Sequence, residues 1–310
     1  MKKIIFMGTP EFSVNPLISL NNSDEINIEL VITGEDKKRS RNKFESTPVK
    51  KKALELGLKV YTPLNVNSEE SLSIIDEINP DFIVVIAYGQ LIKKHLLEKY
   101  KNRIINIHSS LLPKYRGAAP MQWAILNKDK KTGVCSMLIE KTMDTGDVLD
   151  CDTVNIDEDT DISTLHDELS LRSGSLIVNT ILNYDDKFVH RIEQDDDLAS
   201  YSQKISKEMG HISFMENASD IKAKIMAFSV WPSTYVIYKD EKVKIHKIHI
   251  IDKYTNTEEG KIFEVSESGI FVNCKDKCIV IDEIQFPGKK RMDLRSFLLG
   301  NSIEIGESFN

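Results

Sequence analysis

The sequence has no apolar run long enough to span a membrane. Its longest uncharged apolar stretch, Phe82–Tyr88, is far shorter than the roughly 20 residues that cross a bilayer, so we expect no membrane-spanning segment. The opening residues, MKKIIFMG, contain two lysines and a short apolar patch. A secretory signal needs about 7–15 apolar residues, so the opening predicts a buried strand.

Cysteine is scarce, at 4 in 310 residues, which does not indicate a disulfide-based scaffold and predicts a cytoplasmic protein. We expect Cys135 and Cys151 to be buried thiols. Cys274 and Cys278 lack a second cysteine pair and a histidine pair at zinc-finger spacing. Since a structural zinc site needs about four ligands, we expect no metal.

The chain also has no overall excess of positive charge. It carries 41 basic and 48 acidic side chains, a net charge of −7, which argues against a protein that coats nucleic acid. Hydrophobic residues make up 41% and charged residues 29%, which excludes collagen-like and wholly disordered classes. A chain of 310 residues fits one large domain and one smaller one.

The charges that are present are unevenly distributed. Residues 37–52 contain eight basic side chains and one acidic one, Glu45, whereas acidic residues gather at 157–161 and 195–197. A local basic loop on an acidic protein can bind phosphates, because salt confines the field of a charge to about 10 Å. The alternative is a lysine-rich loop that contacts only solvent.

The first half of the sequence alternates strand and helix patterns. The run DFIVVIA at 81–87 is almost entirely apolar, which is typical of a strand buried on both faces of a parallel sheet. We expect strands at 2–7, 26–33, 58–61, 81–87 and 104–107 and helices at 48–56 and 69–78. This rhythm predicts an α/β fold with a doubly wound, mostly parallel sheet. Ligands of such sheets bind outside the carboxyl ends of the strands.

The pattern changes after Gly146. A strand at 148–156 and a long helix at 162–184 are followed by short β-type runs separated by turn residues. These runs lie at 235–238, 243–251, 260–265, 269–274 and 278–284, after a helix at 218–227. Their spacing predicts a second, smaller β-barrel domain. We place the first domain at 1–188, an acid-rich linker at 189–206 and the second domain at 207–310.

The tripeptide Asn106-Ile107-His108 lies at the end of a predicted central strand. Residues two apart on a strand point to the same face, so an amide and an imidazole project together. Acyl transfer needs a donor aimed at the oxygen that gains charge and a group that moves protons; Asn106 and His108 suit these two roles. The alternative is a structural histidine near a strand end.

Asp144 lies in a second polar loop, MDTGD, between two strand-like segments. Its carboxylate could orient or polarise His108, or take a proton from an attacking amine. The alternative is that Asp144 and Asp147 only stabilise a turn, as aspartates often do.

The block NIHSSLLPKYRGAAPMQWAI, followed by MDTGD, closely resembles the formyltransferases that use 10-formyltetrahydrofolate. The opening IIFMGTPEF, the run AYGQLI at 87–92 and the WP pair within 227–235 resemble the members that formylate methionyl-tRNA. The resemblance covers nearly the whole chain. It implies a Rossmann-like first domain, an OB-like β-barrel second domain that binds tRNA, and the charged initiator tRNA and a folate as partners of a monomer.

The resemblance also implies which residues act. Asn106, His108 and Asp144 correspond to the catalytic set of these enzymes. The stretches that contact the formyl donor, 10-formyltetrahydrofolate, correspond to Ser110, Leu111, Leu112, Pro113, Tyr88, Gly89, Gln90, Leu91 and Ile92.

The loop that enters the tRNA acceptor stem in this family corresponds to Lys37, Lys38, Arg39, Arg41 and Lys43. The family usually has proline and glycine in this loop, whereas this chain reads TGEDKKRSRNK and keeps only the charge. Residues 289–291 and Arg295 form a second basic group, which either contacts the tRNA backbone or only solvent.

Two other functions fit the same residues. A formyltransferase for a small amine, such as glycinamide ribonucleotide or an amino sugar nucleotide, needs the same three catalytic residues but no basic loop and no β-rich second domain. The other is a folate- or nucleic-acid-binding protein that has lost activity. The presence of all three catalytic residue types at the expected spacing argues against it.

Overall fold

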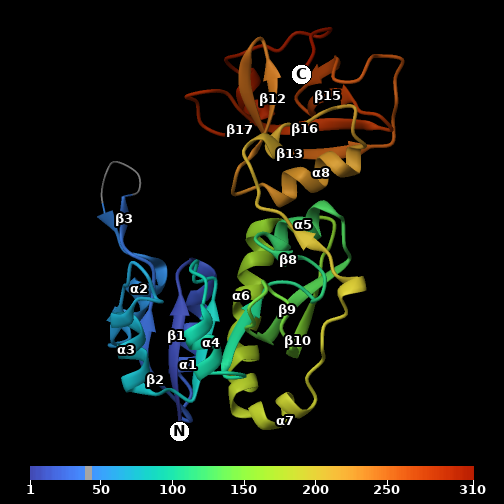
Figure 1. Cartoon of the computed structure of the whole chain (residues 1–310). Helices are drawn as coiled ribbons and strands as arrows, with labels where there is room; N and C mark the ends of the chain where they lie inside the picture. The colour runs from blue at the N-terminus through green and yellow to red at the C-terminus, as the bar shows by residue number, and fades with distance from the viewer. Residues whose placement is uncertain (39–43) are drawn as a thin grey trace. The chain divides into compact units, whose positions relative to one another are not determined.

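The computed structural model describes residues 1–38 and 44–310. The chain divides into two compact units (Figure 1). The first consists of Met1–Pro120, Lys131–Asn155 and His166–Ser202. The second consists of Met121–Lys130, Ile156–Leu165 and Gln203–Asn310.

The first unit contains a 7-stranded sheet with the order β10-β9-β7-β6-β1-β2-β5. Five of its strands are parallel: β1 (Lys2–Gly8), β2 (Ile26–Ile32), β5 (Val60–Tyr61), β6 (Phe82–Ile86) and β7 (Ile104–His108). Strand β9 (Lys131–Leu138) pairs antiparallel with β7, and β10 (Val148–Asn155) pairs antiparallel with β9. The predicted doubly wound, mostly parallel sheet is confirmed.

The helices of this unit form where capping residues and apolar faces favour them. Thr47 accepts a hydrogen bond from Lys50 N at the start of α2, and Ser68 caps α3 in the same way. Ile75 of α3 and Leu96 of α4 pack with Ile5 and neighbouring strand residues in one hydrophobic cluster. The helices of this unit are α1 (Val14–Asn21), α2 (Pro48–Glu55), α3 (Glu69–Ile78), α4 (Lys94–Lys99), most of α6 (Ile162–Leu182) and α7 (Tyr184–Val189). Helix α5 (Pro120–Leu126) and the first turn of α6 belong to the second unit.

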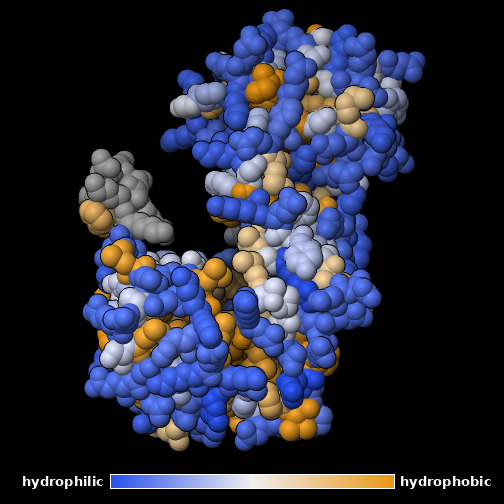
Figure 2. All heavy atoms as spheres, in the orientation of Figure 1, coloured by the Kyte–Doolittle hydropathy of each residue, from blue (hydrophilic) through white to orange (hydrophobic). Residues whose placement is uncertain are grey.

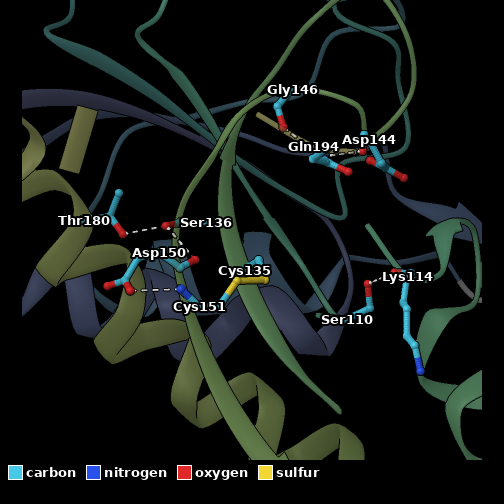
Figure 3. The surroundings of a disulfide bond; sticks show 10 residues. All are labelled: Ser110, Lys114, Cys135, Ser136, Asp144, Gly146, Asp150, Cys151, Thr180 and Gln194. Carbon is cyan, nitrogen blue, oxygen red and sulfur yellow. Dashed lines mark hydrogen bonds between the residues drawn. A yellow bond between two sulfur atoms is a disulfide. The ribbon is translucent and has the colours of Figure 1, made fainter. Parts of the chain in front are cut away.

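The expectation of two buried thiols at Cys135 and Cys151 is wrong, because these residues form a disulfide between β9 and β10 (Figure 3). Cys135 is buried and Cys151 is exposed. The antiparallel register places the two residues directly opposite each other. The segment before the MDTGD loop was expected only to be strand-like, without a partner strand, so the pairing of the two cysteines was not predicted.

The second unit contains an antiparallel sheet with the order β12-β13-β16-β15-β14, and β17 pairs with β16. Its strands are β12 (Thr234–Tyr238), β13 (Glu241–Ile251), β14 (Ile262–Ser266), β15 (Gly269–Asn273), β16 (Cys278–Gln285) and β17 (Met292–Asp293), with helices α8 (Ala218–Ala227) and α9 (Leu294–Leu298). The last residues bond to both sheet edges: Phe309 N donates to Gly260 O and Asn310 N to Ile237 O, each at 2.9 Å. Closure into a full barrel stays a prediction.

One apolar core holds this second unit together. Alternate residues of the strands point inward, such as Val243 and Ile245 of β13, and pack against Ile221 and Ile225 of α8. The face of this unit that Figure 2 shows is mostly hydrophilic. Across both units, no described helix combines the length and the apolar composition that a membrane span requires.

Candidate active site

The carboxyl ends of three neighbouring parallel strands, β1, β6 and β7, share one edge of the sheet. Side chains that follow β1 tie the first two strand ends together. Thr9 Oγ1 donates to the carbonyl oxygen of Tyr88 at 2.9 Å, and Ser13 Oγ donates to that of Ile86 at 2.7 Å. The segment after β1 and the predicted donor-contacting stretch after β6 therefore lie side by side.

Strand β7 carries Asn106 and His108 on one face, because residues two apart on a strand point the same way. Asn106 is partly buried and pairs in register with Val85 of β6 and Met137 of β9. His108 is buried, with 8% of its side chain exposed. Both residues are thus held in register by a strand inside the sheet.

The protonation of His108 is constrained by its surroundings. Its Nε2 lies 2.9 Å from the carbonyl oxygen of Tyr115. A carbonyl oxygen only accepts, so Nε2 carries a proton and donates it. The ring atom that remains available to exchange a proton is therefore Nδ1.

Asp144, from the loop between β9 and β10, faces that ring atom. Its Oδ2 lies 3.7 Å from His108 Nδ1 and accepts a hydrogen bond of 2.8 Å from Gly117 N. The side chain is 17% exposed. Both partners belong to other segments, so the carboxylate does more than close its own turn. The structure brings the predicted imidazole and carboxylate together.

The stretch Tyr88–Ile92 follows β6. Tyr88 is buried, and its hydroxyl has no hydrogen-bond partner among the described residues. Burial, with a smaller contribution from Tyr61, raises the pKa of that hydroxyl above its ordinary value. The Gln90 side chain accepts from Val66 N at 2.8 Å and donates to Pro63 O at 3.1 Å, which fixes this loop. Gly89 and Leu91 are exposed.

The stretch Ser110–Pro113 follows β7. Ser110 is buried, and its hydroxyl donates to the carbonyl oxygen of Lys114 at 2.6 Å. Its side chain therefore shapes the loop from inside. Leu111, Leu112 and Pro113 are partly buried.

The predicted tRNA loop is only partly described. Lys37 and Lys38 form the short strand β3 (Lys37–Lys38), which pairs with β4 (Phe44–Glu45) in an antiparallel hairpin. Arg39, Arg41 and Lys43 lie outside the described residues. In the described ranges, 1–38 and 44–310, no three or more His, Cys, Asp or Glu side chains are grouped so that they could hold a metal ion.

Sequence reasoning missed three residues that hold this site. Arg116 is 1% exposed, and its Nε donates to Gln194 Oε1 at 2.9 Å. Ser202 Oγ donates to the carbonyl oxygen of Tyr115 at 3.3 Å. Arg116 could have been found as a charged residue directly after the site loop, but Gln194 and Ser202 fall in the segment expected to be a linker and carry no motif.

Family comparison decides what chemistry this arrangement belongs to. The formyl transferase profile matches residues 2–181, and the profile of the formyl transferase C-terminal domain matches residues 204–302. The chain belongs to the formyl transferase family. In this formyl transferase, the matched first region contains Asn106, His108 and Asp144.

Relatives match this formyl transferase over its full length. The methionyl-tRNA formyltransferase of Finegoldia magna is 45% identical over 98% of this chain and 98% of its own. The methionyl-tRNA formyltransferase of Clostridium novyi is 41% identical with the same coverage. The solved N-formyltransferase of Helicobacter canadensis, in complex with folinic acid and dTDP-3-aminofucose, shares the fold. Its TM-score is 0.66 at 21% identity, over 91% of this chain and 99% of that one.

Proposed function

We propose that this formyl transferase moves a formyl group from 10-formyltetrahydrofolate to the α-amino group of methionyl-tRNA, the charged initiator tRNA. The observation that carries the proposal is the 3.7 Å approach of His108 Nδ1 and Asp144 Oδ2, beside Asn106 on the same strand. Relatives that share 37–45% identity over nearly the full chain and are named methionyl-tRNA formyltransferase support the acceptor.

The reaction begins when the amine nitrogen attacks the formyl carbon on N10 of the donor. A tetrahedral intermediate forms, with negative charge on the former carbonyl oxygen. The side-chain amide of Asn106 is the proposed donor to that oxygen. One such donor typically lowers the barrier by about 2.7–4 kcal/mol. The bond from carbon to N10 then breaks, and N10 takes a proton as it leaves.

His108 and Asp144 supply the proton transfers. The carbonyl of Tyr115 holds Nε2, so Nδ1 is the atom that gives or takes a proton. The Asp144 carboxylate stabilises the imidazolium form and assists loss of a proton from the attacking amine. These steps use neither a metal ion nor a covalent enzyme intermediate.

The formyl donor is proposed to contact Tyr88–Ile92 and Ser110–Pro113, which follow the adjacent strands β6 and β7. The tRNA is proposed to contact the basic hairpin that begins at Lys37 and the C-terminal domain. The boundaries 1–188, 189–206 and 207–310, the monomeric state and the cytoplasmic location stay predictions.

Transfer of labelled formyl groups tests this function. The protein is incubated with labelled 10-formyltetrahydrofolate and with methionyl-tRNA, glycinamide ribonucleotide or an amino sugar nucleotide. We expect label on the charged tRNA alone. Label on a small amine would instead support the less favoured alternative, and donor binding without transfer would support a binding protein.

A further inference from the structure

The segment at 189–206 holds both members of the proposed catalytic pair through separate contacts. Ser200 Oγ accepts from Tyr115 N at 2.9 Å, and Ser202 Oγ donates to Tyr115 O at 3.3 Å. Tyr115 O in turn accepts from His108 Nε2. A different residue of the segment, Gln194, contacts the loop of Asp144.

Gln194 bridges the turn that carries Asp144. Its Nε2 donates to the carbonyl oxygens of Asp144 at 2.9 Å and Gly146 at 2.7 Å (Figure 3). Asp144 has a φ of 56°, in the left-handed region that few non-glycine residues adopt. Two bonds from a side chain that is only 9% exposed therefore hold an unfavourable backbone conformation in place.

Arg116 fixes the orientation of that carboxamide. Its Nε donates to Gln194 Oε1 at 2.9 Å, so the oxygen of Gln194 faces Arg116 and the NH2 group faces the turn. Arg116 Nη1 also donates to Asp196 at 2.8 Å. The next residue, Gly117, donates its N–H to the Asp144 carboxylate. One short segment thus holds the carboxylate directly and the backbone of the same residue through Gln194.

We propose that Gln194, oriented by Arg116, is a positioning residue that holds the Asp144 carboxylate against His108 Nδ1. The inference rests on the proposed function, since it takes Asp144 as part of the catalytic set. Gln194 touches no reacting atom and acts only through Asp144.

The test is Gln194→Glu. This variant keeps the shape of the side chain and the oxygen that accepts from Arg116, but it replaces the NH2 group by an oxygen that faces two carbonyl oxygens. We expect kcat for formyl transfer to fall about 100-fold, as misplacement of a catalytic group by about 1 Å does. The KM values for donor and tRNA change much less, because the substrate contacts remain.

Gln203→Glu is the matched control, since it makes the same change at an exposed side chain in the same segment. We expect it to keep the wild-type kcat. A double-mutant cycle with Asp144→Asn separates positioning from a general loss of structure. Because Gln194 acts through Asp144, adding Gln194→Glu to Asp144→Asn lowers kcat no further.

A readout without substrate completes the test. Hydrogen–deuterium exchange at 144–147 speeds up in Gln194→Glu if the turn is released. Wild-type kcat in Gln194→Glu, or losses that multiply in the double variant, overturn the inference. If Gln194→Glu does not fold, Gln194→Asn, which keeps the amide but shortens the side chain, replaces it in the same cycle. If the wild type transfers no formyl group, the proposed function fails, while the exchange rates still test the positioning.

Discussion

At the scale of single residues, the proposed chemistry depends on which ring nitrogen of His108 is already engaged in a hydrogen bond. The contact with the Tyr115 carbonyl uses Nε2, and Asp144 lies opposite Nδ1. A histidine that is held at one nitrogen by a neutral acceptor and faces a carboxylate at the other can become positively charged without moving. Asn106, two residues earlier, adds a neutral donor on the same face.

Replacement of the amide tests this arrangement. Asn106→Ala is expected to lower kcat about 10²–10³-fold, because removal of one donor to a developing oxyanion has that effect in other acyl-transfer sites. Steady-state kinetics with methionyl-tRNA measure the loss, and thermal unfolding shows whether the fold persists. Asn27→Ala, on the exposed side of β2, is the control. A near-wild-type rate in Asn106→Ala would remove Asn106 from the proposed mechanism.

The second prediction at this scale concerns the reactivity of the cysteines, of which the chain has four. Burial raises the pKa of the Cys274 thiol to about 12, and it also raises that of Cys278. Because the thiolate is the reactive form, iodoacetamide at neutral pH should leave both residues unmodified in the folded protein. Intact-mass measurement checks this.

The same measurement tests the disulfide between Cys135 and Cys151. After denaturation without reductant, only the two free cysteines, Cys274 and Cys278, take up alkyl groups. After reduction, all 4 cysteines do. Complete alkylation without reductant would contradict the disulfide.

At the scale of elements, a small two-stranded sheet joins the site loop to the segment after the long helix. Strand β8 (Arg116–Gly117) pairs in parallel with β11 (Tyr201–Ser202). Gly117 has a φ of +118°, and a Cβ atom there would lie 2.5 Å from the carbonyl oxygen of Ser202. This pairing requires glycine, because both the conformation and the close approach exclude a side chain.

Gly117→Ala is therefore expected to destabilise the protein by more than about 1 kcal/mol, since alanine is strained at positive φ. Urea unfolding measures the change. Gly57→Ala is the matched control, because Gly57 also has a positive φ, +72°, but nothing lies within 4 Å of its Cβ position. An equal loss in the two variants would show that the contact with Ser202 adds nothing.

These elements also show what the sequence could predict. The helices α3 and α8 have the predicted bounds, because apolar spacing is a local signal; in α3 the capping residue Ser68 is a second local signal. Strand β9 was expected only as a strand-like segment before Asp144, and its register with β10, which pairs Cys135 with Cys151, was not predicted. The contacts of Gln194 were missed as well, since they join residues about 50 positions apart.

At the scale of the whole molecule, the second unit includes two short segments, Met121–Lys130 and Ile156–Leu165, that lie in the sequence before its main part. Lys128, before β9, pairs with Asp220 of α8, and Asp159 pairs with Lys222 of the same helix. The hydrogen bond from Lys128 holds the pKa of Asp220 below its ordinary value. Sequence patterns place domain boundaries at single positions along the chain, so they could not show these interleaved segments.

The charge of the whole protein sets the conditions for the last prediction. A protein with a net charge of −7 repels tRNA at long range, so binding depends on local basic groups whose contacts with phosphates release counterions. Affinity for methionyl-tRNA should therefore fall steeply as salt rises. Replacing Lys37 and Lys38 together by Gln should weaken tRNA binding and reduce the slope of log Kd against log salt by about one unit per lost phosphate contact.

The matched control replaces Lys51 and Lys59 by Gln, since it removes the same charge at exposed positions outside the hairpin. Binding is measured with labelled tRNA over a salt series, and the KM for the formyl donor is measured in parallel. Because the donor is proposed to contact other segments, its KM should stay constant in both double variants. If both double variants reduce the slope of log Kd against log salt equally, the effect reflects only net charge. The hairpin at Lys37 then has no specific role in tRNA binding.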